Sequence, residues 1–238
     1  MTKISIIGSG TVGTIIGSGF SEVGYSVTFY DIDQKKLDLL RSKGYSVTND
    51  LKYIVLNTDV SFICVPTPLS EERSPRGYRK MNLSYIENVT KNISSLLKEK
   101  GNYHTLAIKS TVLPNTAEKL VIPILKNTIE QTDKKVGVCV NPEFLTEITG
   151  TWTKNEQFIK NFFNEDRYVI GEQYQNSESG DILEELYKEV NKYSGNKAPI
   201  ERVSLSEAAW IKLMANAALA CKISYFNDLF EAAKKFGI

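Results

Sequence analysis

KISIIGSGTVG, residues 3–13, decides the fold of this chain. The apolar run before Gly8 predicts a buried parallel strand, and the residues that follow Gly13 predict a helix. In this G-x-G-x-x-G pattern, Gly8 permits a tight turn, Gly10 lets the backbone approach a pyrophosphate, and Gly13 lets helix and strand pack closely. The helix N-terminus then offers unpaired N–H groups to the phosphates.

Asp31 strengthens this interpretation. It follows a second predicted strand, Ser26–Tyr30, and lies eighteen residues after Gly13. Its carboxylate can accept a hydrogen bond from a ribose hydroxyl and would repel a 2′-phosphate, so the sequence favours NAD over NADP as cofactor. The plain alternatives are structural turns for the glycines and a helix N-cap for an aspartate, which we favour for Asp33.

The composition is that of an ordinary globular protein. Of the 238 residues, 42% are hydrophobic, which is enough for a sizeable core. The 29 basic and 28 acidic residues are scattered and nearly cancel, so neither nucleic acid nor an acidic membrane surface is expected as a partner. No apolar run is long enough to span a bilayer, and no secretory signal precedes the first strand, so a cytoplasmic protein is expected.

Few residues are available for thiol, metal or histidine chemistry. The three cysteines, Cys64, Cys139 and Cys221, lie far apart without metal-ligand spacing, so no metal site is expected. Cys64 and Cys139 lie in apolar runs and are expected to be buried thiols. His104 is the only histidine and is expected to lead into a strand, so chemistry built on a catalytic histidine is not indicated.

Short apolar runs alternate with helical patterns along the chain. This alternation predicts an α/β fold, a Rossmann-type doubly wound parallel sheet followed by a long α-helix. Further extended segments are expected at 60–65, 105–109, 136–140, 168–171 and 199–203, with a short strand and helix within 46–57. Helices are expected at 12–23, 34–43, 83–98, 116–130, 177–192 and from a Ser204/Glu207 cap to about residue 236. Residues 66–81 are polar and are expected to form a loop, either a flap over the site or a plain solvated loop.

Five further segments point to one family. They are CVPTP at 64–68, KSTV at 109–112, NPEFLTE at 141–147, DRYVIG at 166–171 and IKLMAN at 211–216. Together with the glycine motif, their order and spacing resemble the UDP-glucose/GDP-mannose dehydrogenase family over essentially the whole chain.

The resemblance implies an activity and a domain plan. Family members oxidise the C6 hydroxyl of a nucleotide sugar to a carboxylate in two NAD-dependent hydride transfers. UDP-glucose oxidation to UDP-glucuronate is the preferred expectation, and UDP-N-acetylmannosamine and GDP-mannose remain open. The plan implied is an NAD-binding Rossmann domain over 1–203 and the first part of a central dimerisation helix over 204–238, with the C-terminal substrate domain absent.

The same resemblance implies which residues form the site. The expected cofactor-binding residues are Gly8, Gly10, Thr11, Val12, Gly13, Asp31, Val65, Pro66, Thr67, Pro68, Ser110, Thr111 and Glu147. The expected catalytic residues are Thr111, Glu143, Lys212 and Asn216, and the expected substrate-binding residues are Glu143, Phe144, Leu145, Lys212 and Asn216. Glu143 resembles the family's proposed general base, and Glu147 resembles the glutamate close to the nicotinamide. Lys212 and Asn216 resemble the pair that stabilises negative charge developing at C6.

The spacings agree with these roles. Glu143 and Glu147 would share a face if their segment were helical. Lys212 and Asn216 are one turn apart on the long helix, and a lysine and an amide aimed at one point make an oxyanion site.

Each role has a plain alternative. The two glutamates can be helix-start residues, Lys212 a surface lysine and Thr111 an ordinary strand-end residue, and a structural role is favoured for Ser110.

Two departures from the family pattern shape the functional expectation. Ile148-Thr149-Gly150 follows Glu147, and the link from there to Arg167 is longer than usual. The chain also ends at Ile238, and none of its cysteines has the glycine-rich context of the family's nucleophile. We therefore expect a half-enzyme with a complete cofactor domain and an incomplete active site. The alternatives are a non-catalytic NAD- or partner-binding remnant and a different Rossmann dehydrogenase acting on a small hydroxy acid.

The final helix is expected to carry a broad apolar surface. Its members are Leu205, Ala208, Ala209, Ile211, Leu213, Ala217, Leu219, Ile223, Phe226 and Phe230. Such a surface predicts a homodimer or a partner chain.

Overall fold

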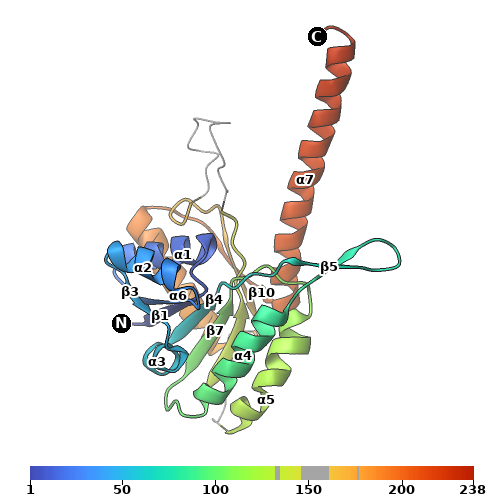
Figure 1. The fold of residues 1–238 in the computed structure, drawn as a ribbon. Coiled ribbons are helices and arrows are strands. Elements are labelled where there is room, and N and C mark those ends of the chain that lie inside the picture. The colour runs from blue at the N-terminus through green and yellow to red at the C-terminus, as the bar shows by residue number, and fades with distance from the viewer. Residues whose placement is uncertain (132–134, 146–160, 176) are drawn as a thin grey trace.

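An eight-stranded sheet covered by helices on both faces forms the body of the molecule, and a long helix leaves it (Figure 1). The computed structural model describes residues 1–131, 135–145, 161–175 and 177–238. The strands of the sheet are β1 (Lys3–Ile7), β2 (Ser26–Tyr30), β3 (Ser46–Thr48), β4 (Val60–Ile63), β7 (His104–Ile108), β8 (Val136–Val140), β9 (Tyr168–Glu172) and β10 (Ile200–Ser204). The helices are α1 (Thr11–Val23), α2 (Gln34–Ser42), α3 (Leu51–Asn57), α4 (Ser84–Leu97), the π-helix η1 (Ala117–Val121), α5 (Ile122–Gln131), α6 (Glu178–Ser194) and α7 (Leu205–Lys235).

The strand order is β10-β9-β8-β7-β4-β1-β2-β3, which confirms the α/β fold expected from the sequence. The chain moves outward from β1 to β2 and β3, then crosses to the other side of β1 to form β4. A ligand crevice is expected at this reversal, at the carboxyl ends of the strands. The expectation of an all-parallel sheet is wrong at one place, because β8 and β9 pair antiparallel.

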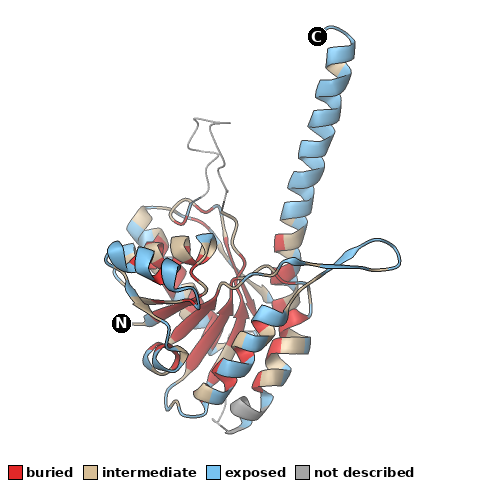
Figure 2. Cartoon of the chain, viewed as in Figure 1, coloured by how far each residue is buried: buried red, intermediate tan, exposed pale blue. Residues whose placement is uncertain are grey.

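Two apolar clusters, one on each face, hold the sheet between its helices, and the central strands are coloured as buried in Figure 2. Alternate side chains of β1 point to opposite faces, so Ile6 joins the cluster under α1 and α6, and Ile7 joins the cluster under α3, α4 and α5. The central strands are buried on both faces, and this explains their continuous apolar sequences.

Residues 66–81 are not a plain loop. They form an antiparallel hairpin of β5 (Leu69–Arg73) and β6 (Arg79–Met81) that projects from the carboxyl end of β4 (Figure 1). Its turn is closed by a hydrogen bond from the Ser74 N–H to the Tyr78 carbonyl (2.7 Å), with Gly77 at a φ of +80°. The sequence did not predict this hairpin, because both of its strands face solvent for most of their length and therefore carry polar residues instead of an alternating apolar pattern.

Helix α7 begins at the predicted cap and divides into two parts. The Ser204 hydroxyl accepts from the Glu207 N–H, and the Glu207 carboxylate accepts from the Ser204 N–H, so the capping box is confirmed. Leu205, Ala208 and Ala209 are buried against the sheet. Beyond Asn216 the helix is exposed except at the half-buried Ala233 (Figure 2), so only the later members of the predicted apolar surface are bare.

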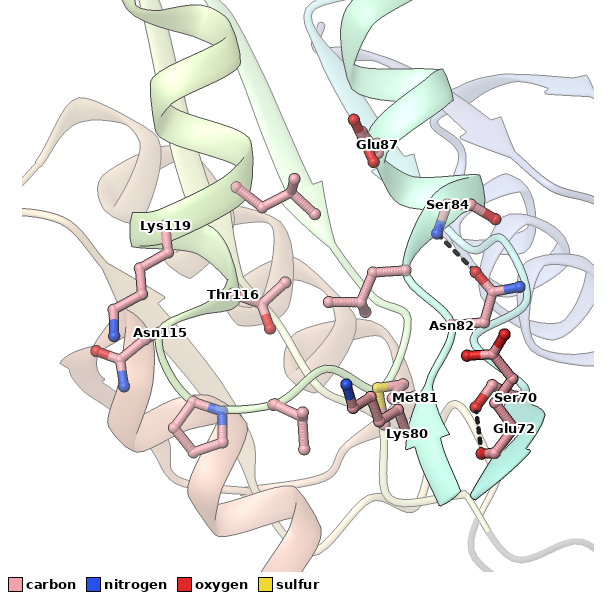
Figure 3. Close-up of a pocket in the computed structure, with 14 residues that line it drawn as sticks. Ser70, Glu72, Lys80, Met81, Asn82, Ser84, Glu87, Asn115, Thr116 and Lys119 are labelled. Atoms are coloured by element: carbon pink, nitrogen blue, oxygen red, sulfur yellow. Dashed lines mark hydrogen bonds between the residues drawn. The ribbon is translucent and has the colours of Figure 1, made fainter. Parts of the chain in front are cut away.

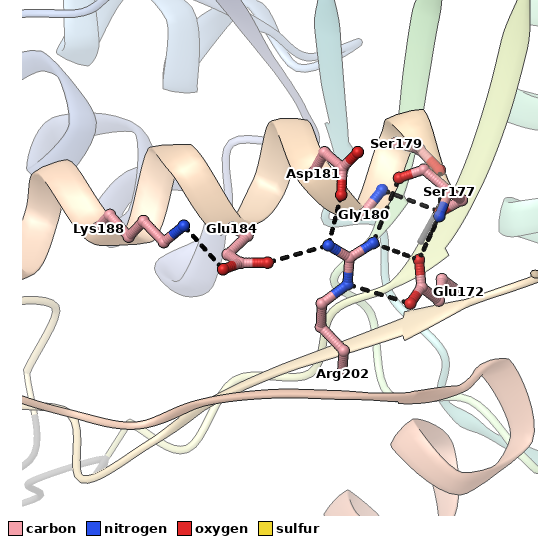
Figure 4. Close-up of polar contacts among 8 residues, drawn as sticks. All are labelled: Glu172, Ser177, Ser179, Gly180, Asp181, Glu184, Lys188 and Arg202. Carbon is pink, nitrogen blue, oxygen red and sulfur yellow. Dashed lines mark hydrogen bonds and ion pairs between the residues drawn. The ribbon is translucent and has the colours of Figure 1, made fainter. Parts of the chain in front are cut away.

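A charged cluster fastens α6 to the outer strands (Figure 4). The guanidinium of Arg202 on β10 binds both carboxylate oxygens of Glu172 on β9, at 3.0 and 2.7 Å, and also pairs with Asp181 and Glu184 of α6. Burial alone would raise the pKa of Glu172, but hydrogen bonds from Arg202 and Ser177 outweigh it and lower that pKa to about 2.

Buried polar side chains also join β4 and β7 in the middle of the sheet, near the amino end of β7. His104 opens β7 as predicted and is fully buried, with Nε2 2.9 Å from Ser61 Oγ and Nδ1 2.9 Å from Lys100 Nζ. Burial, with the nearby Lys100 charge, lowers the pKa of His104 to about 3. Cys139 is buried as expected, Cys64 is only partly buried, and Cys221 is exposed. Within the described ranges, no helix has both the length and the apolar character needed to cross a bilayer.

Candidate functional site

The glycine turn between β1 and α1 leaves an open, donor-lined surface. A Cβ on Gly8 would lie 2.7 Å from the Cys64 carbonyl oxygen, and one on Gly13 would lie 2.0 Å from the Gly8 carbonyl oxygen. A side chain at either position would clash with a backbone carbonyl, so close packing requires glycine at both. Gly10 differs, because a Cβ there would meet no atom within 4 Å. Gly10 is also the N-cap of α1 and supplies no side-chain cap, so the first N–H groups of the helix face this open space.

Asp31 is fixed beside this turn. It is 6% exposed, and its carboxylate accepts hydrogen bonds from the Ser9 N–H (2.7 Å) and the Asp33 N–H (2.9 Å). Lys36 Nζ lies 3.4 Å from one of its oxygens. Asp31 therefore braces the glycine turn, a role that the sequence did not reveal. Asp33 is the N-cap of α2, as predicted, and accepts from the Lys35 N–H.

A cavity of about 210 Å³, here called the inner cavity, opens between the glycine turn and the ends of β4 and β7. It is lined by Gly10, Thr11, Val12, Cys64, Val65, Pro66, Lys109, Ser110, Thr111 and Glu143. The fold thus brings together residues predicted from four separate motifs: the glycine motif, CVPTP, KSTV and NPEFLTE. Cys64 and Lys109 also line the cavity but were not predicted as site residues. Cys64 is the first residue of the CVPTP motif, and Lys109 is the first residue of the KSTV motif.

Some predicted cofactor residues lie outside the inner cavity. The Thr67 hydroxyl donates to the Thr111 carbonyl (2.8 Å) and ties the start of the hairpin to the end of β7. Pro68 is exposed on the hairpin side. The Ser110 hydroxyl donates to the carbonyls of Ile63 and Val65, which supports the structural role favoured for it. Glu147 lies outside the described residues.

A second cavity of about 540 Å³, here called the outer cavity, adjoins the first. It is lined by Thr111, Glu143, Phe144, Leu145, Asp166, Arg167, Lys212, Ala215, Asn216 and Leu219. Thr111 and Glu143 line both cavities and so stand at their junction. Arg167 and Asp166 were quoted in the sequence motif but were not expected to line a site.

Glu143 and Lys212 form an ion pair at this junction. Lys212 Nζ lies 3.0 Å from Glu143 Oε1, and the side chains are 8% and 15% exposed respectively. The other carboxylate oxygen accepts from the Leu145 N–H (2.7 Å). Lys212 is therefore not a surface lysine. Residues 141–145 have no regular secondary structure, so Glu143 is not part of a helix.

The Phe144 ring lies between two cations. The guanidinium carbon of Arg167 is 4.5 Å from the ring centroid, and Lys212 Nζ is 5.5 Å from it. Both contacts are within the range of cation–π attraction. They hold the ring at the wall of the outer cavity, which Asn216, one helical turn beyond Lys212, also lines.

A third cavity, of about 620 Å³, lies between the hairpin and the segment that leads into η1 (Figure 3). Its charged lining residues are Glu72, Lys80, Glu87 and Lys119. The side chains described around it include none of the predicted site residues. Among the residues that the structure describes, this cavity shares none of its lining with the inner or outer cavity. It is linked to them in sequence, because its lining residues Leu113 and Pro114 follow shortly after Thr111.

The arrangement fits a dinucleotide. An uncapped helix N-terminus, open space at Gly10 and a fixed carboxylate at Asp31 are the groups that hold a diphosphate and a ribose. Across the described part of the chain, no three His, Cys, Asp or Glu side chains gather in a metal-binding group.

Comparison with known proteins agrees with this geometry. The chain matches the family model for the NAD binding domain of the UDP-glucose/GDP-mannose dehydrogenase family, over residues 2–49 and 40–191. It is similar to GDP-mannose 6-dehydrogenase of Pseudomonas aeruginosa, with 34% identity over 99% of this chain and 54% of the relative. It is also similar to UDP-glucose 6-dehydrogenase AglM of Haloferax volcanii, with 31% identity over 99% of this chain and 55% of the relative.

A solved structure shows the same fold. The UDP-glucose dehydrogenase of Pyrobaculum islandicum superposes with a TM-score of 0.77 and 30% identity, over 96% of this chain and 52% of that one. The chain therefore spans about half the length of the relatives it matches.

Proposed function

This chain belongs to the UDP-glucose/GDP-mannose dehydrogenase family, and on that premise we propose that it supplies the NAD-binding half of a nucleotide-sugar 6-dehydrogenase site. NAD is its cofactor, as the family's NAD-binding domain requires. The observation that carries the proposal is the Glu143–Lys212 ion pair, which stands where the inner and outer cavities meet.

The glycine turn is proposed to hold the cofactor. The N–H groups at the start of α1 bind the diphosphate, the open space at Gly10 admits it, and the Asp31 carboxylate accepts from a ribose hydroxyl. NAD, when bound, accepts the hydride that leaves the sugar carbon. The chain's remaining contributions concern proton transfer and charge.

Glu143 is proposed as the general base. Its carboxylate takes the proton from the C6 hydroxyl, and Lys212 at 3.0 Å holds that carboxylate at the junction of the cavities. Once Glu143 is protonated, the ammonium of Lys212 is free to stabilise negative charge on the C6 oxygen, together with the Asn216 amide. The Thr111 hydroxyl is proposed to orient the same oxygen.

The sugar is proposed to be a nucleoside-diphosphate sugar that occupies the outer cavity. GDP-mannose and UDP-glucose are the two candidates, because relatives of both activities match the chain at similar identity. The preference for UDP-glucose drawn from the sequence gains no support from these identities.

The first experiment measures NAD binding and NADH formation by the same purified chain. Calorimetry is expected to show NAD binding, and UDP-glucose and GDP-mannose are then each supplied with NAD. The half-enzyme hypothesis expects no more than one NADH per sugar, so sustained formation of two NADH would contradict it. The Glu143→Gln variant, which keeps the size of the side chain, is expected to bind NAD normally and to form no NADH. A folded chain that binds no NAD would refute the proposed cofactor site.

Self-association through α7 is proposed as well. Ile223, Phe226 and Phe230 are 54%, 63% and 61% exposed on the part of the helix that leaves the body (Figure 1). Exposed apolar surface of this kind marks an interaction site. Sedimentation velocity is expected to show dimers that the double variant Phe226→Glu/Phe230→Glu abolishes, whereas Asp228→Lys, on the opposite face of the helix, serves as the control. A monomer at high concentration would contradict the proposal.

A further inference from the structure

A buried lysine lies directly behind the proposed base. Lys109 follows the last residue of β7 and is 4% exposed. Its ammonium donates to Asn141 Oδ1 (3.0 Å), to the Pro142 carbonyl (3.2 Å) and to the Tyr187 hydroxyl (3.1 Å). All three N–H groups of the ammonium therefore have protein partners.

The partners of Lys109 are connected with one another. The Tyr187 hydroxyl donates to Asn141 Oδ1 at 2.5 Å, and the Asn141 amide donates to the Val169 carbonyl at 2.8 Å. Asn141 is thus anchored at both ends of its side chain, to α6 and to β9. Residues 141–145 have no helix or strand to define their path, so these bonds take the place of secondary structure.

This anchoring acts on the residue that follows. Pro142 is held by its carbonyl, and the next residue is Glu143, whose carboxylate reaches Lys212 and the Leu145 N–H. The Cα position of Glu143, and hence the place where its carboxylate meets the two cavities, follows from how Asn141 and Pro142 are fixed.

The charge on Lys109 is costly, so its presence calls for a reason. Burial of an ammonium group is unfavourable, and an apolar side chain of similar volume would pack here at no electrostatic cost. Burial lowers the pKa of Lys109, and the opposing attraction comes from Glu165, Glu143 and Cys64. Lys109 also lines the inner cavity beside Glu143 and Thr111, where a cation can act on the site.

We propose that Lys109 is a positioning residue, which fixes the Asn141–Pro142 backbone and thereby presents the Glu143 carboxylate at the junction of the two cavities. This inference rests on the proposed function, because Glu143 is its proposed base. Lys109 touches neither the reacting atoms nor the sugar in this role.

The Leu145 N–H reports the position of the Glu143 carboxylate without any catalysis. It donates to that carboxylate at 2.7 Å, and an N–H bound to a charged acceptor resonates at low field in amide NMR spectra. In Lys109→Ala this resonance is expected to move upfield. Propylammonium restores the missing three carbons and the charge, so it is expected to return the resonance toward its wild-type position, whereas propan-1-ol is not.

Lys100→Ala is the control for loss of a lysine that donates to backbone carbonyls. Lys100 is half-buried and donates to the carbonyls of Val55 and Thr58, near the amino end of β7, whereas Lys109 lies at its carboxyl end. It is expected to destabilise the protein and to leave the Leu145 resonance in place. An unmoved Leu145 resonance in folded Lys109→Ala, or equal rescue by propan-1-ol, would overturn the proposal.

A pair of stacked tyrosines provides a second test in case Lys109→Ala does not fold. The rings of Tyr187 and Tyr168 stack with their centroids 4.2 Å apart. The Tyr168 hydroxyl is buried without a hydrogen-bond partner among the described residues. Tyr187→Phe removes one support of Asn141 and is expected to move the Leu145 resonance upfield, whereas Tyr168→Phe is expected to leave it unchanged. A Leu145 resonance that responds to neither, or equally to both, would overturn the proposal.

The outcomes separate this inference from the proposed function. NADH formation by Glu143→Gln tests whether Glu143 is the general base. The Leu145 resonance tests whether Lys109 positions the Glu143 carboxylate. A shifted Leu145 resonance together with an active Glu143→Gln variant would leave the positioning intact and refute the base.

Discussion

Lys212 Nζ lies 3.0 Å from Glu143 Oε1, although 69 positions separate the two residues in the chain. The pair joins the first turns of α7 to the irregular segment after β8, and both side chains are largely buried. This contact brings the NPEFLTE motif at 141–147 and the IKLMAN motif at 211–216 together in space.

Breaking this pair is expected to destabilise the fold. Lys212→Met leaves the Glu143 charge buried without its cation and is expected to cost about 3 kcal/mol in urea unfolding. Adding Glu143→Gln to Lys212→Met is expected to recover part of that loss, because the uncompensated charge is gone. Lys222→Met, on the exposed part of α7, is the control and is expected to change stability by less than about 0.5 kcal/mol. Additive single effects would argue against a coupled pair.

Gly10→Ala separates cofactor binding from folding. The φ of Gly10 is −74°, and its Cβ would meet no atom within 4 Å, so alanine fits the chain itself. The added methyl group occupies space proposed for the cofactor, so the affinity for NAD in calorimetry is expected to fall roughly tenfold or more, with little change in melting temperature. Gly101→Ala, which also has open space at its Cβ, controls for the loss of a glycine. Unchanged NAD affinity in Gly10→Ala would contradict the proposed position of the cofactor.

His104 is expected to make the protein less stable in acid. Burial lowers its pKa from 6.5 to about 3, so the unfolded chain binds one more proton than the folded protein between these values. The contribution of His104 is therefore complete above pH 6.5 and is lost as the pH falls toward 3, by about 1.4 kcal/mol per pH unit. Urea unfolding of His104→Gln across this range is expected to lack that contribution. A variant with the same pH slope as the wild type would exclude His104 as its source.

Glu165 is expected to make the protein less stable as the pH rises, which is the reverse of the pH dependence expected from His104. Burial raises its pKa from 4.5 to about 7, against the attraction of Lys109, so the folded protein binds the extra proton between these values. Stability from Glu165 is present below pH 4.5 and is lost as the pH rises through 7. Relative to the wild type, Glu165→Gln is expected to gain about 3 kcal/mol in unfolding free energy on passing from pH 4.5 to 7. Glu184→Gln, whose carboxylate belongs to the Arg202 cluster, should show no such gain.

Arg202 is expected to be hard to replace. Its guanidinium binds both oxygens of Glu172 and reaches Asp181 and Glu184, which a lysine ammonium cannot do at one time (Figure 4). Arg202→Met is expected to cost about 3 kcal/mol, because the buried Glu172 carboxylate loses the guanidinium charge and keeps neutral donors such as Ser177. Arg202→Lys is expected to recover less than half of this loss in the same urea measurement. Full recovery by lysine would show that charge alone, and not the fork geometry, fastens α6.

Local sequence signals predicted most of the elements that position the site. The strand, glycine turn and helix at residues 3–23 follow from an apolar run and from the spacing of three glycines, both of which can be read within a few residues of sequence. The caps at Asp33 and Ser204 follow in the same way, since each side chain bonds to backbone two or three residues away. The antiparallel pairing of β9 and the hairpin at 69–81 were missed, because strand direction and edge pairing depend on distant partners.

Local patterns predicted an α/β dinucleotide-binding fold, and the family resemblance of the motifs implied Thr111, Glu143, Lys212 and Asn216 as site residues. The three-dimensional arrangement alone reveals that Lys212 is buried against Glu143, that Asp31 braces the glycine turn, and that Lys109 donates to the Pro142 carbonyl just before Glu143. The physical reason is that periodicity and caps act over a few residues. Ion pairs and cavities instead form where the sheet brings strand ends together, at separations that no local pattern records.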